Sequence, residues 1–296
     1  MSVDCTISVM SSPFAKRRII IGVSVAVQDS EQVTIDLSKG AVKMNKQELK
    51  KYWKKEENVA HMRGWDFSYI EKRYQTFENE LPWDYKEIVK RYLRPEHSLL
   101  DIDTGGGEFL LSFQHPYALT SVTEGYAPNV KLCQEKLGAL GIKVYEVTNY
   151  EKMPFRDNEF DIIINRHGAY DTKELYRILK PGGLFITQQV GEDNDSDLVE
   201  FLLPESEKMF PGMNLKNQKE RFEQAGFEIL MSEEALKPIE FYDVGALVWF
   251  ARIIEWEFVG FSVDDCFEQL LQAQELLERE GCIRGNVFRY MIVERK

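Results

Sequence analysis

The chain is poor in the residues that build metal sites and disulfide frameworks. Its 296 residues include only four cysteines and four histidines. The cysteines stand at positions 5, 133, 266 and 282, and the histidines at 61, 97, 115 and 167. No two cysteines have Cys-x-x-Cys spacing, so the pattern predicts neither a zinc site nor a disulfide framework and favours a reducing compartment. We therefore expect a cytoplasmic protein that needs no metal.

The chain also lacks long apolar runs and an excess of positive charge. No run approaches the roughly 18 residues that a membrane-spanning helix needs, so we expect no membrane partner. The net charge of −12 disfavours a nucleic-acid partner, because such binding depends on lysine and arginine side chains that neutralise phosphates. A small molecule is the partner that these observations favour, and the sequence leaves the oligomeric state open.

What is present is the composition of an ordinary globular protein, with 44% hydrophobic and 29% charged residues. A chain of this length forms one large domain or a core with a smaller cap. The expected parts are residues 1–43 as an N-terminal extension, 44–94 as a helical cap, 95–240 as the core, 241–284 as a helical lid insertion and 285–296 as the final core strand.

The first 43 residues differ from the rest of the chain. Lys16, Arg17 and Arg18 precede an apolar run at 19–27, which is the outline of a signal peptide. The run is rich in β-branched residues, which fits a β-hairpin better. A third interpretation is that Met44 is the biological start. We favour an extension that is dispensable.

Short apolar segments alternate with helical patterns between residues 99 and 190. This alternation predicts an α/β fold, a mostly parallel sheet with helices on both faces. The expected strands are at 98–103, 118–123, 142–147, 160–165 and 183–189, and the expected helices at about 107–113, 127–139 and 172–179. Ligands of such sheets bind beyond the carboxyl ends of the strands.

The flanking segments have helical patterns. Residues 45–92 place apolar side chains at helical spacing, and residues 243–256 are apolar almost all round, which is typical of a buried helix. We expect these two segments to form a lid over the active site, followed by a helix at 263–280. A helix at 216–225 and strands at 227–231 and 287–293 complete the expected elements.

The most informative stretch runs from Leu99 to Phe109, where an apolar strand meets Asp101 and then a glycine-rich turn that opens a helix. Glycines allow a close approach of the backbone to a ligand, and a helix start offers free N–H donors. Glu124 follows Asp101 by 23 residues, the spacing at which a second strand presents an acid to ribose hydroxyls. The dinucleotide fingerprint fails at its third glycine, where this chain has Leu110. The stretch predicts a cofactor of the adenosine type.

Four further motifs follow this turn in order. They are Glu124-Gly125-Tyr126, Asn149 to Phe155, Phe160 to Asn165, and Leu179 to Ile186 with its Pro-Gly-Gly. Together with the turn they resemble the class I S-adenosylmethionine-dependent methyltransferases, in particular the type 11 branch. The resemblance implies a Rossmann-like fold with a seven-stranded sheet, S-adenosyl-L-methionine as cofactor, and transfer of a methyl group by in-line displacement.

One position departs from the family pattern. Asp103 stands where relatives usually have glycine, close to the place of the methionine end of the cofactor. Its carboxylate could bind the ammonium group of the cofactor, or it could narrow the turn and repel the cofactor carboxylate.

The resemblance also implies which residues hold the cofactor. The resemblance assigns the methionine end of the cofactor to the turn, the ribose to Glu124, and the adenine to residues after the second and third expected strands. It places Asn165 near the methyl group. The implied set is Asp101, Asp103, Thr104, Gly105, Gly107, Glu124, Gly125, Tyr126, Asn149, Tyr150 and Asn165.

The residues on the acceptor side follow from position and chemistry. His167 comes directly after an expected strand and could act as a general base near neutral pH, or it could cap a helix or join surface ion pairs. Aromatic residues beside acids could line a pocket or staple helices to the core. The candidates for contact with the substrate are Trp65, Trp83, Arg166, Tyr170 and Gln188.

These observations favour a methyltransferase that acts on a small molecule. An RNA or protein methyltransferase is disfavoured by the negative charge and by the absence of a zinc module. A nicotinamide-dependent dehydrogenase is disfavoured by Leu110. A cofactor-binding protein that has lost catalysis and serves as a scaffold or sensor stays open, because of Asp103.

Overall fold

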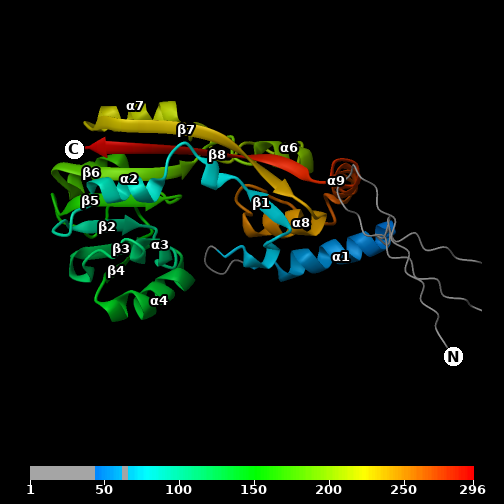
Figure 1. Ribbon diagram of the computed structural model, residues 1–296, viewed down its shortest axis with the longest axis horizontal. Helices are drawn as coiled ribbons and strands as arrows, with labels where there is room; N and C mark the ends of the chain where they lie inside the picture. The colour runs from blue at the N-terminus through cyan, green and yellow to red at the C-terminus, as the bar shows by residue number, and fades with distance from the viewer. Residues whose placement is uncertain (1–43, 62–65) are drawn as a thin grey trace, which may run out of the picture. The chain divides into compact units, whose positions relative to one another are not determined.

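A mixed β-sheet lies at the centre of residues 50–296 (Figure 1). The computed structural model describes residues 44–61 and 66–296, so the expected extension at 1–43 lies outside the described residues. The eight strands found in the described part have the spatial order β1-β7-β8-β6-β5-β2-β3-β4. Their bounds are β1 Tyr74–Thr76, β2 Leu99–Ile102, β3 Thr120–Glu124, β4 Lys143–Glu146, β5 Phe160–Arg166, β6 Leu179–Val190, β7 Glu228–Phe241 and β8 Ile283–Arg295.

Strands β4, β3, β2, β5 and β6 are parallel, and β8 lies antiparallel between β6 and β7. The predicted α/β fold, with a mostly parallel sheet, is confirmed. The expected number of seven strands is corrected to eight, because the three-residue strand β1 pairs with the end of β7. This strand lies in the segment for which the sequence predicted only helices, and three residues are too few to show a strand period.

Helices cover both faces of the sheet. Helices α2 (Tyr85–Tyr92), α3 (Glu108–Leu111) and α4 (Ala127–Lys136) pack on one face, called here the α2 face. Helices α5 (Thr172–Ile178) and α7 (Leu215–Ala225) pack on the other, the α5 face. Each central strand is buried on both sides, because alternate residues such as Leu99 and Leu100 enter the two different apolar clusters.

The remaining helices are α1 (Lys46–Val59), α6 (Ser196–Leu202), α8 (Val244–Ile253) and α9 (Phe267–Glu280), with short 3₁₀ turns at Ser68–Ile70, Glu78–Glu80, Tyr117–Leu119 and Gly138–Leu140. Helix α8 is buried along nearly its whole length. A side chain at Gly245 would meet the hydroxyl of Tyr52 at 2.7 Å, so α8 lies directly against α1. The buried character predicted from its apolar sequence is confirmed.

A polar network joins the start of α8 to α1 and to Arg73, the residue before β1. The guanidinium of Arg73 donates to Asp243, Glu56 and the hydroxyl of Tyr52. Asp243 also accepts the N–H groups of Gly245 and Ala246, which caps the start of α8. One arginine therefore ties the N-terminal end of α8 to α1. We call the four elements α1, β1, α8 and α9 the cap.

The two strands β7 and β8 continue beyond the rest of the sheet. The last pair between β6 and β8 is Val190 with Arg289, whereas β7 and β8 stay paired as far as Phe241 with Ile283. Six further residues of β8 thus extend about 20 Å past the carboxyl end of β6. The cap is attached to this ribbon, beyond the carboxyl edge of the parallel strands (Figure 1). The boundaries proposed for the domains stay a prediction.

Candidate cofactor and acceptor site

The turn after β2 is shaped by three residues with left-handed backbone. Asp103, Gly105 and Gly107 have φ values of 56°, 63° and 76°. Glycine adopts this region freely, whereas a residue with a side chain pays about 1 kcal/mol or more there. Asp103 therefore occupies a strained position, which gives a physical reason for the glycine that the family resemblance led us to expect there. At Gly107 a side chain would also meet Leu137 at 2.7 Å.

Glu124, at the end of β3, organises this turn from within. Its carboxylate accepts the N–H of Gly105 at 2.9 Å and the N–H groups of Gly125 and Tyr126 at 3.0 Å each. A carboxylate offers about four acceptor positions, so one remains for a ligand. The predicted contact of Glu124 with ribose hydroxyls fits this geometry, and the residue also has a structural role that the motif did not reveal.

Two residues of α4 support the back of the turn. The thiol of Cys133 donates to the carbonyl of Gly105 at 2.9 Å, and the ammonium of Lys136 donates to the carbonyl of Gly106 at 3.0 Å. Neither residue belongs to a motif, and no spacing in the sequence pointed to them.

Three carboxylates gather around the turn, and we call Asp101, Asp103 and Glu124 the acid cluster. Burial, together with the neighbouring carboxylates, raises the pKa of Asp101 to about 7 and the pKa of Asp103 to about 6. Thr104 donates its hydroxyl to Asp101 at 2.6 Å. A bound cation would relieve the mutual repulsion of these acids.

Asp103 faces the loops that follow β4 and β5. Its carboxylate accepts the hydroxyl of Tyr150 and the N–H of Ala169, the latter at 3.2 Å. A side chain at Gly168 would meet this carboxylate at 2.6 Å and the amide nitrogen of Asn165 at 2.7 Å. Gly168 thus permits the contact between two loops that carry predicted site residues.

The expected adenine end is more open. Tyr126 is 51% exposed, and Asn149 is exposed and accepts the N–H of Glu151 at 3.0 Å. A side chain at Gly125 would meet the carbonyl of Val147 at 2.7 Å, so this glycine lets β3 and β4 end close together. The adenine contacts of these residues stay predictions.

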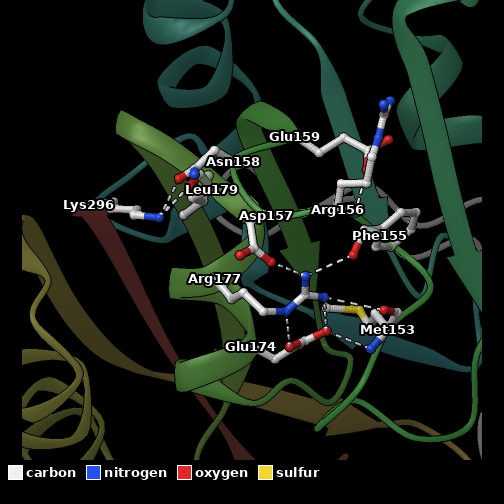
Figure 2. Close-up of polar contacts among 10 residues, drawn as sticks. All are labelled: Met153, Phe155, Arg156, Asp157, Asn158, Glu159, Glu174, Arg177, Leu179 and Lys296. Carbon is white, nitrogen blue, oxygen red and sulfur yellow. Dashed lines mark hydrogen bonds and ion pairs between the residues drawn. The ribbon is translucent and has the colours of Figure 1, made fainter.

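The loop between β4 and β5 is fixed from its other end by α5 (Figure 2). Arg177 donates to Glu174, to Asp157 at 2.7 Å and to the carbonyl of Phe155 at 2.8 Å. Glu174 in turn accepts the N–H of Met153 at 2.6 Å. These contacts hold the Met-Pro-Phe part of the motif, and they position the loop that carries Asn149 and Tyr150.

A second group of polar side chains lies at the ends of β5 and β6. Asn165 is fully buried; its amide nitrogen donates to the carbonyl of Ile102 at 3.0 Å, and its oxygen accepts from Thr187 at 3.1 Å and from Gln189. Tyr85 donates to the carbonyl of Ile186 at 2.9 Å and accepts the N–H of Asn165 at 3.2 Å. We call Asn165, Thr187, Gln188 and Gln189 the amide cluster.

The structure brings three of the predicted acceptor-side residues together. The indole N–H of Trp83 donates to the side-chain oxygen of Gln188 at 2.7 Å. The amide nitrogen of Gln188 lies 3.5 Å from Nε2 of His167. Burial lowers the pKa of His167 well below its ordinary value, and the guanidinium groups of Arg289 and Arg166 lower it further. His167 is therefore neutral near pH 7.

Two other predicted residues are separated by the sheet. Arg166 lies on the α2 face, with its guanidinium 4.3 Å from the ring centre of Phe109. Tyr170 instead packs on the α5 face against Phe185 and Phe222. Tyr170 thus contributes to the apolar cluster of the α5 face, and its contact with the substrate stays a prediction. Trp65 lies outside the described residues.

The part of the chain that the structure describes contains no group of three or more His, Cys, Asp or Glu residues arranged to bind a metal ion. None of the helices in the same part is long and apolar enough to cross a membrane.

Comparison with known proteins agrees with the sheet and the turn. Residues 100–187 match the family model of the methyltransferase domain, type 11. The ubiquinone/menaquinone biosynthesis C-methyltransferase UbiE of Pasteurella multocida is 30% identical over 104 residues, which are 31% of this chain and 39% of that protein. The uncharacterised methyltransferase YcgJ of Bacillus subtilis is 31% identical over 121 residues, 37% of this chain and 47% of that protein.

The chain thus spans less than half the length of these two curated relatives. A crystal structure from Bacillus halodurans, of a protein described as a methyltransferase, has a TM-score of 0.51 and 18% identity. It covers 72% of this chain and 98% of its own, and at this identity it supports the fold alone. Residues 100–187 therefore contain a match to a methyltransferase domain of type 11, and the sheet and the glycine turn of the described chain agree with that match.

Proposed function

We propose that this protein binds S-adenosylmethionine at the carboxyl ends of β2 and β3 and transfers its methyl group to a small molecule held near the carboxyl ends of β5 and β6, beside Arg289 within β8. The observation that carries the proposal is the acid cluster around a left-handed glycine turn, inside the segment that matches the methyltransferase domain.

The residues of the turn fit this cofactor. A side chain at Gly105 would find nothing within 4 Å, so space lies in front of the turn. The acids beside it have raised pKa values, which a positively charged sulfonium or ammonium group would lower. When bound, the cofactor supplies a methyl group on an already activated sulfur. The protein then has to align the acceptor and exclude water.

Each half of the site has its own task in this proposal. Glu124 holds the turn and offers its remaining acceptor position to the ribose. Asp101 and Asp103 present negative charge to the methionine end. The cap, attached beyond the carboxyl edge by the β7–β8 ribbon, limits access of water to the acceptor.

Charge and relatives support a small-molecule acceptor. The chain carries a net charge of −12, which disfavours RNA. UbiE is named for C-methylation in quinone biosynthesis, an activity on a small organic molecule.

A second candidate is a protein that binds the cofactor without catalysis. The strained Asp103 favours it, because a partly buried carboxylate in this turn could reduce the space for the methionine end.

Calorimetric titration with S-adenosylmethionine and S-adenosylhomocysteine, with NAD as control, tests the proposal. We expect micromolar binding of both sulfur nucleotides and none of NAD. Binding of NAD alone would contradict the proposal. The Asp103→Gly variant separates the two candidates, because a large gain in affinity would indicate a decayed site, whereas equal or lower affinity would indicate a working one.

A further inference from the structure

Trp83, Gln188 and His167 form a line of polar contacts that determines where protons lie. The indole N–H of Trp83 can only donate, and it lies 2.7 Å from the side-chain oxygen of Gln188. This contact fixes the orientation of the amide, with its oxygen toward Trp83 and its nitrogen on the other side. Both side chains are more than 90% buried, so no solvent competes for the bond.

The orientation of the amide in turn selects a tautomer of His167. The amide nitrogen of Gln188 lies 3.5 Å from Nε2 of the imidazole. An amide NH₂ group only donates, so Nε2 has to accept. In a neutral imidazole the proton is then on Nδ1.

Nδ1 of His167 is buried and finds no hydrogen-bond partner among residues 44–61 and 66–296. A buried donor without an acceptor is rare in native structures and calls for an explanation. The backbone of His167 is also left-handed, with φ of 64°, and its N–H is held by the carbonyl of Gln188 at 2.9 Å. Strained backbone that orients an unpaired polar group is typical of a ligand site.

The surroundings favour an acceptor with negative charge. Arg166 of β5 pairs with Gln188 of β6, and Arg289 of β8 pairs with Val190 of β6. By alternation along the strands these positions share the α2 face. Arg289 also faces the carboxyl groups of Asp195 and Glu257, and Arg166 faces Asp101. Both guanidinium groups still lower the pKa of His167, so their positive charge reaches the imidazole and favours an acceptor oxygen that carries negative charge.

We propose that His167 is a neutral Nδ1–H tautomer that donates a hydrogen bond to an oxygen atom of the methyl acceptor, with Gln188 and Trp83 as positioning residues. The inference rests on the proposed function and names the acceptor class: a molecule with an anionic oxygen, such as a phenolate, an enolate or a carboxylate. His167 is then a donor to the substrate rather than the general base that its place in the sequence suggested.

Nitrogen NMR of the full chain labelled with ¹⁵N-histidine at pH 7 tests the tautomer. His167→Asn identifies the resonances among the four histidines. We expect a protonated Nδ1 and a bare Nε2. In Gln188→Glu the carboxylate accepts from Nε2, so the proton should move to Nε2 or the ring should become charged. A protonated Nε2 in the wild type, an imidazolium, or an unchanged pattern in Gln188→Glu would overturn the assignment.

Sodium benzoate and benzylamine, each added with S-adenosylhomocysteine, test the acceptor class. We expect benzoate alone to shift the Nδ1 resonance; a shift with benzylamine alone, or with neither, would overturn the oxygen acceptor. Calorimetry on the same samples distinguishes failure of the proposed function from failure of the His167 assignment. If the wild type does not bind S-adenosylhomocysteine, the proposed function is contradicted. If wild type and Gln188→Glu bind it with affinities equal within about threefold, an unexpected NMR result contradicts only the assignment of His167.

Discussion

The acid cluster and the amide cluster lie at the same edge of the sheet and are held in different ways. Glu124 is held by backbone N–H groups, two of them from its immediate neighbours and one from Gly105. Asn165 is held mainly by side chains and carbonyls from other strands. The first cluster concentrates charge in a local turn, and the second spreads neutral hydrogen bonds across the sheet.

Because of this difference, we expect substitutions in the two clusters to change different properties of the protein. Charges in a local turn can be neutralised by a bound cation, so changes there should act first on cofactor affinity. A buried network of neutral groups is costly to leave unsatisfied, so changes there should act first on stability. Gly168, which stands between Asp103 and Asn165, is the point where the two clusters meet.

The largest effect is expected from Glu124→Ala. It removes three charge-assisted hydrogen bonds and leaves their N–H groups unsatisfied. We expect the Kd for S-adenosylhomocysteine to rise about a thousandfold, which is about 4 kcal/mol. Calorimetry measures it. The control is Glu146→Ala, which removes an exposed carboxylate paired with Glu124 in the same ladder. Equal losses in both variants would contradict a specific role of Glu124.

Asn165→Ala should act on stability instead. It leaves the carbonyl of Ile102 and the side chains of Thr187 and Gln189 without their partner. We expect the free energy of unfolding, measured in urea, to fall by about 3 kcal/mol. Asn149→Ala, at an exposed asparagine, should lose less than about 1 kcal/mol. If Asn165→Ala weakens cofactor binding while stability stays unchanged, the division between the clusters is wrong.

Gly168→Ala should damage both clusters at once. Its added carbon would lie 2.6 Å from Asp103 and 2.7 Å from Asn165, so both side chains have to move. We expect about 2 kcal/mol of lost stability together with about a tenfold weaker Kd. Thermal unfolding and calorimetry on one preparation test this pairing. Gly138→Ala, where a side chain meets nothing within 4 Å, should leave both unchanged.

Asp103→Asn tests the charge of the acid cluster through the pH dependence of the free energy of unfolding. The pKa of Asp103 is about 6 in the folded protein, against an ordinary value of 3.8. Between these values the folded state holds the proton more tightly than the unfolded state, so stability falls as pH rises through this window. The variant has no carboxylate that titrates in this window, so we expect its stability relative to wild type to rise by about 2 kcal/mol between pH 4 and pH 7. Urea denaturation at both pH values decides, and a constant difference would contradict the raised pKa.

The contacts within the turn after β2 were easier to predict from the sequence than the contacts around Gln188, for a physical reason. Asp101, Gly105 and Glu124 are separated by short stretches of chain, so their spacing reflects their geometry. Trp83 and Gln188 are 105 residues apart, and no local pattern records that they touch. The position of Tyr170 shows the same limit, because only the direction of the side chain decides between acceptor and core.

The same argument applies to the fold. The parallel strands and their helices were predicted because strand and helix periods are local signals. The extension of β7 to Phe241 and its pairing with β1 were missed, since both depend on partners distant in sequence. Asp103 is an intermediate case. Its departure from the glycine pattern was visible, but the left-handed backbone and the contact with Tyr150 required the structure.

Strand β8 follows every other strand of the described chain, yet it lies inside the sheet between β6 and β7. Its pairs with β6 join residues about a hundred positions apart. During synthesis, β6 therefore keeps an unpaired edge until residues 283–295 have left the ribosome. The parallel strands can pair early, but β8 can join the sheet only after the end of the chain has been synthesised. Until then, the unpaired edge of β6 is where a nascent chain is most open to association with other chains.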